Sequence, residues 1–332
     1  CRVATQEATP SAPLTPEQRA AIFTEIWGNV NRWYPLFHIK GVDWAKVKTD
    51  FAPRVATVKD DREFYRLMDE MLDTLHDAHT QVLDYPHRHK NTGMPALDLT
   101  EAEGQVVVAH VERGSQAEAA GIKPGMVLKT INGRPVEERI TALVSRGISS
   151  TPWYTRALAI RYRLLDGQCG SEVTLLFADG TQRALHRHFY VPFAEAQKVS
   201  WKALPDGIGY IRIPSWDTRL PVVAEVDQAL DVLRSSRALI FDARGNPGGD
   251  DRFAAKVIGR LLTQSERVTR VTQRFSFLGR TWKSPRGTRI VLPRGKWRFT
   301  GPVVVLTDHF TSSSSEFFAN AMKACKRGTL IG

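Results

Sequence analysis

The chain of 332 residues is longer than a typical single domain, and 42% hydrophobic with 24% charged residues is a globular composition. The absence of any run of about 18 or more apolar residues excludes a membrane-spanning helix from the given sequence. The three cysteines form neither a disulfide framework nor a metal-ligand spacing, so no metal or cofactor is expected.

The chain starts with Cys1, followed by a Pro-, Thr- and Ser-containing tract without apolar periodicity. Residues 1–14 are therefore expected to be a flexible tether. A Cys at the head of such a tether resembles the lipid-carrying N-terminus of mature bacterial lipoproteins. The resemblance implies a protein of the bacterial cell envelope, in the periplasm and attached to the membrane through a lipidated Cys1. The alternative is an arbitrary chain boundary that falls on a cysteine.

Residues 15–90 have the pattern of a small helical domain. Thr15, Pro16 and Gln18 predict a helix start, in which Thr15 caps the helix and Gln18 closes a capping box. A loop containing HIKGVDW is expected before a second helix that begins near Asp60. The apolar residues of this second helix recur at helical spacing. They are Phe64, Leu67, Met68, Met71, Leu72 and Leu75.

Residues 91–190 change to a β-rich pattern. QVVVAHV predicts a strand, and SQAEAA predicts a short helix that ends at Gly121 in the left-handed cap conformation. Asn132 and Gly133 predict the tight turn of a hairpin. This order of strands and turns resembles a PDZ domain. The resemblance implies a groove in which a peptide adds a strand; the alternative is a spacer of the same fold that binds nothing.

From residue 195 to residue 332 strands and helices alternate, which indicates an α/β layer with a buried sheet. Within it, residues 267–298 hold ten Lys or Arg and no Asp or Glu, so nearly all of the net charge of +11 lies there. Their alternation predicts paired strands with one basic face. We expect a solvated face, or one that favours anionic envelope surfaces or acidic peptide. A nucleic-acid surface is disfavoured because the stretch contains no nucleic-acid-binding motif.

Two loops of this last part carry the residue types of an active site. After the strand that ends at Asp242, the chain passes through Gly245, Gly248 and Gly249 into a helix. Glycines let backbone N–H groups turn toward one point, and the helix start adds a positive dipole, so the loop can cradle an oxyanion. It lacks a P-loop lysine and the GxGxxG pattern, which disfavours nucleotide binding. The alternative is a plain strand-to-helix turn.

The second loop contains four consecutive serines, residues 312–315, before a helix expected to start at about Ser314 or Ser315. A nucleophile at a helix start gains from the helix dipole, and the amide that follows it can stabilise a tetrahedral oxyanion. Capping alone would explain only one or two of the serines. No Gly-x-Ser-x-Gly elbow is present, which disfavours an α/β-hydrolase.

A nucleophilic serine needs a base, and the segment LHDAHT, residues 75–80, offers two histidines. His79 lies four residues after Leu75, so helical spacing predicts that it points inward. From spacing alone, that placement favours a core or capping histidine over a catalytic one. His76 is the second candidate.

The motifs LHDAHT, IFDARGNPGGD and VVVLTDHFTSSSSEFF follow one another around the PDZ-like segment. In this order they resemble the serine peptidases of the C-terminal processing peptidase and tricorn protease group. The leading helical region is similar to the tricorn-type helical domain. The resemblance covers nearly everything after residue 15. It implies a multidomain α+β fold: a helical domain, a PDZ-like β-rich domain and an α/β catalytic core of the layered, tricorn- and crotonase-like kind.

Carried over by position, the resemblance makes Ser313 the nucleophile, three residues before the acid of a Ser-x-x-Glu pattern. It assigns the oxyanion hole to the N–H of Ser314 together with one from Gly248 or Gly249. It also favours His79 as the base.

The chain departs from the group in two respects. The serine that precedes the tricorn-type histidine is Ala78 here. Processing peptidases use a Lys as the base, and tricorn-type members orient the His with a later carboxylate. Both would fall after Gly332, so the base is either His79 or a Lys outside the given residues.

We therefore expect a serine endopeptidase that hydrolyses peptide bonds of misfolded or tail-tagged envelope proteins through an acyl-enzyme. Its partner would be a polypeptide substrate, not a nucleic acid. The alternative is a catalytically inactive ligand- or peptide-binding protein of the same fold, with an apolar pocket near FSFLGRTW. Cleavage specificity and oligomeric state stay open.

Overall fold

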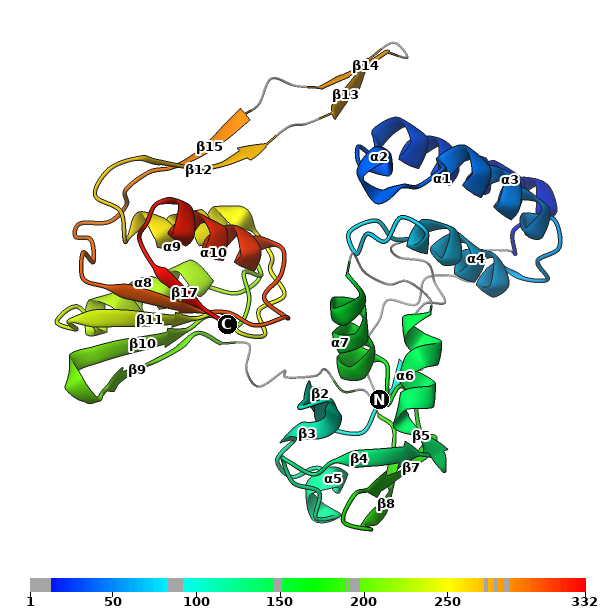
Figure 1. The fold of residues 1–332 in the computed structure, drawn as a ribbon, viewed down its shortest axis with the longest axis horizontal. Coiled ribbons are helices and arrows are strands. Elements are labelled where there is room, and N and C mark those ends of the chain that lie inside the picture. Colours follow the sequence, from blue (N-terminus) through cyan, green and yellow to red (C-terminus); the bar gives the residue numbers. More distant parts are fainter. Residues whose placement is uncertain are drawn as a thin grey trace. The chain divides into compact units, whose positions relative to one another are not determined.

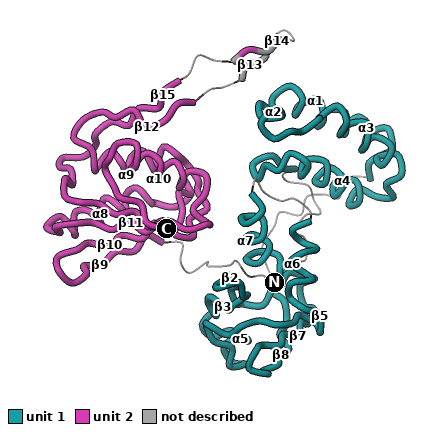
Figure 2. The backbone as a smooth tube through the Cα atoms, in the orientation of Figure 1, with its two compact units in different colours: residues 1–192, 276–281 teal, residues 193–275, 282–332 magenta. Residues whose placement is uncertain are grey.

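The computed structural model describes residues 13–82, 92–145, 151–188, 190, 198–271, 274–277, 280–283 and 287–332. The chain folds into two compact units, residues 1–192 with 276–281 and residues 193–275 with 282–332 (Figure 2). Three hydrophobic clusters form the cores, two in the first unit and one in the second. Most of the predicted tether, with Cys1, lies outside the described residues, as does part of FSFLGRTW. The division into domains at residues 14, 90 and 190 remains a prediction.

The first unit begins with four helices, α1 (Pro16–Trp33), α2 (Phe37–Lys40), α3 (Trp44–Val55) and α4 (Asp61–Asp73) (Figure 1). The predicted capping box of α1 is confirmed: the Thr15 N–H donates to Gln18 Oε1 at 2.8 Å, and the Gln18 N–H donates to Thr15 Oγ1 at 3.2 Å. The apolar stripe predicted for α4 is buried at all six positions. It therefore forms the centre of the helical core.

The loop predicted around HIKGVDW is wrong, because most of this segment is helical. Helix α2 ends at Gly41, whose φ of +67° is the left-handed cap that glycine favours. Asp43 then caps α3 by accepting a hydrogen bond from the Lys46 N–H at 2.9 Å. Two capped helices thus stand where the sequence indicated one irregular connection.

The rest of the first unit is β-rich. Its strands are β1 (Thr92–Gly93), β2 (Leu97–Ala102), β3 (Gln105–Val111), β4 (Leu128–Ile131), β5 (Arg134–Pro135), β6 (Gly167–Gln168), β7 (Glu172–Phe177) and β8 (Gln182–His186); its helices are α5 (Gln116–Ala119), α6 (Val136–Val144) and α7 (Pro152–Tyr162). Strands β5, β4, β7 and β8 form one sheet in that order, and β2 pairs with β3. The predicted left-handed Gly121 and the Asn132-Gly133 turn are confirmed by φ values of +78°, +50° and +76°. The PDZ-like assignment stays a prediction.

The second unit contains a five-stranded sheet in the order β17-β16-β11-β10-β9. Its strands are β9 (Ser200–Leu204), β10 (Ile208–Arg212), β11 (Ala238–Asp242), β16 (Val303–Leu306) and β17 (Thr329–Ile331), and its helices are α8 (Val222–Val232), α9 (Asp251–Gly259) and α10 (Ser314–Ala324). All strand pairs are parallel except β9 with β10. The predicted α/β alternation is therefore confirmed.

One face of this sheet is buried under the helices (Figure 1). Ile211, Phe241 and Val305 stand side by side in neighbouring strands and are 0% exposed. Phe318 of α10 packs on Phe241 with ring centroids 5.9 Å apart. The sheet and the helices thus pack as two layers, and this packing fixes the positions of the strand ends.

The predicted basic strands pair: β12 (Glu266–Val271) is antiparallel to β15 (Gly287–Val291), and β13 (Arg274–Phe277) forms a two-stranded sheet with β14 (Arg280–Lys283). Val268 is buried, whereas Arg267 and Arg270 are exposed; the single basic face stays a prediction. Within the described ranges, no helix combines the length and apolar character that crossing a membrane requires.

Candidate active site

Three loops of the second unit meet at one edge of its sheet. They follow β10, β11 and β16, which are adjacent parallel strands. Because parallel strands end at the same edge, the loops of residues 213–218, 243–249 and 307–313 are brought together there. A cavity of about 830 Å³ opens between them and the start of α9, and its lining includes Gly248, Gly249, Ser313 and Ser314.

Asn246 holds the glycine loop in place. Its side chain is fully buried, donates from Nδ2 to the Ile213 carbonyl at 2.9 Å and accepts at Oδ1 from the Gly248 N–H at 2.9 Å. Its backbone carbonyl accepts from the Ser312 N–H at 3.1 Å. A buried amide with its groups satisfied in this way makes the loop rigid, since moving it would leave polar atoms unpaired.

Asp308 connects the serine loop to the glycine loop from the other side. Asp308 Oδ1 accepts from the Gly245 N–H at 2.9 Å, and the Asp308 N–H donates to Thr311 Oγ1 at 2.9 Å. Thr311 Oγ1 in turn lies 3.0 Å from the carbonyl oxygen of Ala243, to which it donates. The two loops are therefore positioned as one body.

Ser313 is the residue immediately before α10, and its backbone is strained. Its φ of +54° with ψ of −119° lies in a region that L-residues rarely adopt. The N–H of Ser313 donates to Glu316 Oε2 at 2.7 Å, which holds this turn against the helix. A serine held by a strained strand-to-helix turn is the arrangement by which hydrolases present a nucleophile.

The glycine loop contacts this turn so closely that only glycine fits. A Cβ on Gly248, whose φ is +103°, would lie 2.6 Å from Ser313 Cβ and 2.9 Å from the Ser312 carbonyl oxygen. A Cβ on Gly249, whose φ is +145°, would likewise lie only 2.3 Å from backbone atoms of Trp216. Packing thus requires glycine at two positions of this loop, 248 and 249, which a plain strand-to-helix turn would not.

The N–H groups beside Ser313 differ in their availability. The Gly248 N–H is occupied by Asn246 Oδ1. Among the described residues, no acceptor is present for the N–H of Gly249 or for that of Ser314, the first residue of α10. Of the two glycines considered from the sequence, Gly249 is therefore the one with an available donor.

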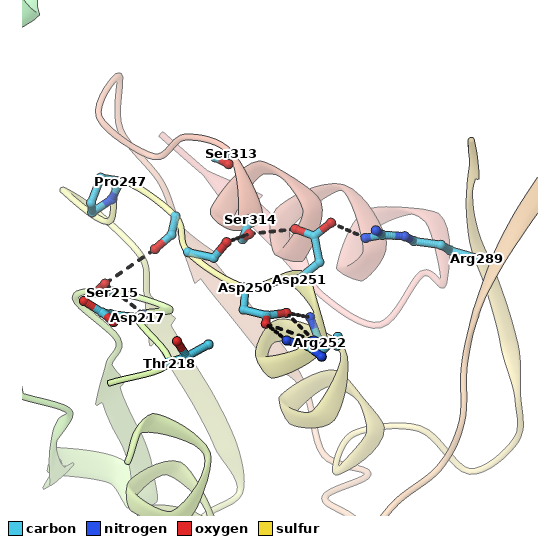
Figure 3. Close-up of a pocket in the computed structure, with 12 residues that line it drawn as sticks. Ser215, Asp217, Thr218, Pro247, Asp250, Asp251, Arg252, Arg289, Ser313 and Ser314 are labelled. Carbon is cyan, nitrogen blue, oxygen red and sulfur yellow. Dashed lines mark hydrogen bonds and ion pairs between the residues drawn. The ribbon is translucent and has the colours of Figure 1, made fainter. Parts of the chain in front are cut away.

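The other three serines of the run make structural contacts. Ser312 Oγ donates to the Pro247 carbonyl at 3.0 Å, Ser314 Oγ lies 2.8 Å from the Gly249 carbonyl oxygen, and Ser315 Oγ accepts from Trp216 Nε1 at 3.0 Å. These three serines thus bind the two loops together, whereas the capping role expected for one serine falls to Ser313, which forms a capping box with Glu316. Ser313 alone of the four is strained and lines the cavity without being buried (Figure 3).

The charges around the cavity are paired. Arg219 hydrogen-bonds to Asp217 and lowers the pKa of that carboxyl to about 2, and Arg252 does the same to Asp250. Both carboxylates are therefore ionised at neutral pH, each beside its arginine (Figure 3).

Asp242, at the end of β11, anchors the start of the glycine loop. Burial raises the pKa of Asp242, but hydrogen bonds from Arg244 and from Tyr210 outweigh it and leave the pKa below its ordinary value. Its carboxylate accepts from the Tyr210 hydroxyl at 2.6 Å and from Arg244 Nη2 at 2.7 Å. Asp242 is thus held in its charged form where the glycine loop starts.

Family comparisons agree with this geometry. Residues 207–332, which contain all three loops, match the family model described as Peptidase family S41. Residues 15–73 match that of the Tricorn protease C1 domain. Residues 207–332 thus carry a peptidase family S41 domain. The class this supports is a serine-type peptidase, as the resemblance implied.

Curated relatives of this chain carry related names. It is 26% identical over 320 residues to the putative tricorn protease homolog 2 of Streptomyces coelicolor, covering 88% of this chain and 24% of that protein. It is 27% identical over 357 residues to the chloroplastic C-terminal processing peptidase of Tetradesmus obliquus, covering 98% of this chain and 69% of that protein. The chain thus spans about a quarter of the first of these relatives and about two thirds of the second.

Solved structures show the same fold. The photosystem II D1 C-terminal processing protease matches with a TM-score of 0.53 and 22% identity, covering 96% of this chain and 81% of that one. Mature CPAF matches with a TM-score of 0.73 and 13% identity, covering 95% and 83%. At these identities the likeness concerns the fold.

The structure places His79 in the first unit of the chain, whereas Ser313 lies in the second. The prediction that helical spacing points His79 inward is wrong. Helix α4 ends at Asp73, and His76 takes a left-handed φ of +47°, so the helix does not continue to position 79. His79 is exposed in its unit, and its N–H donates to Asp77 Oδ1 at 2.9 Å. Its pairing with Ser313 stays a prediction.

The sequence did not single out Asn246, Trp216 or Asp251, which hold the two loops. Their roles depend on contacts between residues far apart in the chain, from 33 positions for Asn246 with Ile213 to 99 for Trp216 with Ser315. Only Asn246 offered a local signal in the sequence, as a polar residue within the glycine loop. An Asn that becomes buried there needs hydrogen-bond partners for its amide.

Proposed function

We propose that this chain is a serine endopeptidase that cleaves polypeptides with Ser313 as nucleophile. The observation that carries the proposal is the strained turn at Ser313, in contact with a glycine loop whose Gly249 N–H is available. A strained nucleophile beside unoccupied N–H donors is what acyl transfer requires.

In the proposed reaction Ser313 Oγ attacks the scissile carbonyl carbon and gives its proton to a base, for which His79 is the candidate in the described residues. The N–H groups of Ser314 and Gly249 would hold the oxyanion that forms. Collapse of the tetrahedral intermediate breaks the C–N bond, and the amine leaves with the proton from the base. Water then releases the acyl group from Ser313 by the same steps.

Substrates are proposed to be misfolded or tail-tagged proteins of the bacterial cell envelope. Support comes from relatives named as C-terminal processing proteases, among them that of Synechocystis. The β-rich part of the first unit is the candidate for presenting a peptide, through the PDZ-like groove expected there. Membrane attachment through Cys1 stays a prediction, because Cys1 lies outside the described residues.

The test is labelling of the full-length protein with a fluorophosphonate, which reacts with activated serines. We expect the wild-type protein to take the label and Ser313→Ala to take none while remaining folded. Ser265→Ala is the matched control, since Ser265 is an exposed serine of the same unit outside the cavity lining and should leave the label in place. Label retained in Ser313→Ala would refute the assignment of the nucleophile. A wild-type protein that takes no label yet binds peptide would favour the alternative of an inactive binding protein.

A further inference from the structure

Ser314 is tied through its side chain to both loops that bear the candidate oxyanion donors. It is 1% exposed, and its Oγ lies 2.6 Å from Asp251 Oδ1 and 2.8 Å from the Gly249 carbonyl oxygen. A hydroxyl has one proton, and the carboxylate is both the nearer and the charged acceptor, so it is the stronger partner. The orientation of the first turn of α10 therefore depends on Asp251.

Asp251 is itself held by a residue from a third element. Arg289 of β15 pairs with Asp251 Oδ2, and its guanidinium also lies over the ring of Phe317 in α10, 5.3 Å from the centroid. Figure 3 shows the resulting chain of contacts, Ser314 to Asp251 to Arg289, along one wall of the cavity. Helix α9, helix α10 and strand β15 are thereby joined at the site.

The charge of Asp251 makes the Arg289 contact important for chemistry. An unpaired carboxylate close to a developing oxyanion would oppose it by like-charge repulsion, which is strong in a partly buried site. The Asp251 and Arg289 side chains are 35% and 47% exposed, so the pair is only partly screened by solvent. The arginine thus allows a charged acceptor to hold Ser314 without a net negative charge beside the reaction.

We infer that Asp251 is a positioning residue of this peptidase, which aims the Ser314 N–H at the oxyanion, and that Arg289 neutralises it. The inference rests on the proposed function. It differs from a purely structural role because it predicts that the rate depends on the balance of charge between positions 251 and 289.

The test measures fluorophosphonate labelling of Ser313 in the full-length protein, separating the maximal rate from the probe concentration that gives half of it. Asp251→Ala removes the acceptor for Ser314, so the maximal rate should fall about tenfold with the half-saturating concentration unchanged. Asp251→Asn keeps an acceptor oxygen and should stay within about threefold of wild type. Glu266→Ala, which removes a carboxylate of the same unit away from the cavity, should stay within about twofold.

The charge balance is tested with Arg289→Met. This variant leaves the Asp251 carboxylate unneutralised, so its maximal rate should also fall about tenfold. Combining it with Asp251→Asn removes the repulsion, and the double variant should recover to the rate of Asp251→Asn alone. A structural contact would show no such recovery.

Two results overturn the inference: an Asp251→Ala rate within twofold of wild type, or a double variant no faster than Arg289→Met alone. If the label still depends on Ser313 in these cases, only the role of Asp251 fails. If the wild-type protein takes no label at all, the proposed function fails and this inference with it.

Discussion

The room available for a side chain, as well as chemistry, determines which residue types the site can hold. Gly248 has no room for a side chain, since a Cβ would meet Ser313 and Ser312 at under 3 Å, and its φ of +103° disfavours any other residue. The loop can give way only by moving Ser313 or its own backbone. Position 248 therefore couples the glycine loop directly to Ser313, the proposed nucleophile.

Gly248→Ala should lower the labelling rate of Ser313 by ~100-fold, the order expected when an oxyanion donor is displaced. It should also lower the free energy of unfolding by about 1–3 kcal/mol, the cost of a residue held in a disfavoured backbone region. Denaturant unfolding and fluorophosphonate kinetics measure the two effects. The control is Gly207→Ala, which shares a positive φ of +68° but meets nothing nearer than 3.9 Å. Equal rates in the two variants would contradict the steric explanation.

Among the elements, α10 contributes most to the site, and its N-terminal turn is unusual. Its first residue supplies a candidate donor, and the residue before it is the candidate nucleophile. Glu316 stabilises this turn twice, by accepting the Ser313 N–H and by placing a negative charge in the first turn of the helix. The acid of the Ser-x-x-Glu pattern thus maintains the backbone strain at Ser313.

Glu316→Ala should lower the free energy of unfolding by about 1 kcal/mol, the usual cost of a lost helix cap. It should also slow the labelling of Ser313, because the strained turn loses the contact that holds it. Glu316→Gln keeps an acceptor oxygen, so it should recover most of both losses. A Gln variant as slow as the Ala variant would indicate that the charge matters and the hydrogen bond does not.

For the molecule as a whole, the proposed nucleophile and base belong to different units. Ser313 lies in the second unit, and His79 lies in the loop after α4 in the first. Lys40 Nζ donates to the His76 carbonyl at 2.9 Å, and Asp77 accepts from the His79 N–H, so this loop is ordered by contacts in its own unit. The proposed chemistry therefore requires the two units to act together.

His79→Ala should reduce fluorophosphonate labelling at neutral pH by ~100-fold or more, the contribution expected of a general base. His38→Ala, which changes an exposed histidine of α2 in the same unit, should leave the labelling rate unchanged. If His76→Ala carries the loss in place of His79→Ala, the base is at position 76. Wild-type rates in both variants would indicate a base outside the given residues.

Much of the architecture followed from short-range pattern. The capping box at Thr15, the apolar stripe of α4, the Asn132-Gly133 turn and the start of α10 near Ser314 each depend on residues within a few positions of one another. These features need only local hydrogen bonds and side-chain periodicity, which is why the sequence predicted them. Helices α2 and α3 were missed because their pattern is short and is interrupted by Gly41.

The chain alone could propose Ser313, Ser314 and a glycine partner as site residues, since strand, loop and helix follow one another in the sequence at both loops. It could not decide between the N–H groups of Gly248 and Gly249. The Asn246 side chain makes the difference between them. Its Oδ1 accepts from the Gly248 N–H, and its Nδ2 donates to the Ile213 carbonyl. Which donors stay available depends on partners that only folding brings into contact, and no local pattern records them.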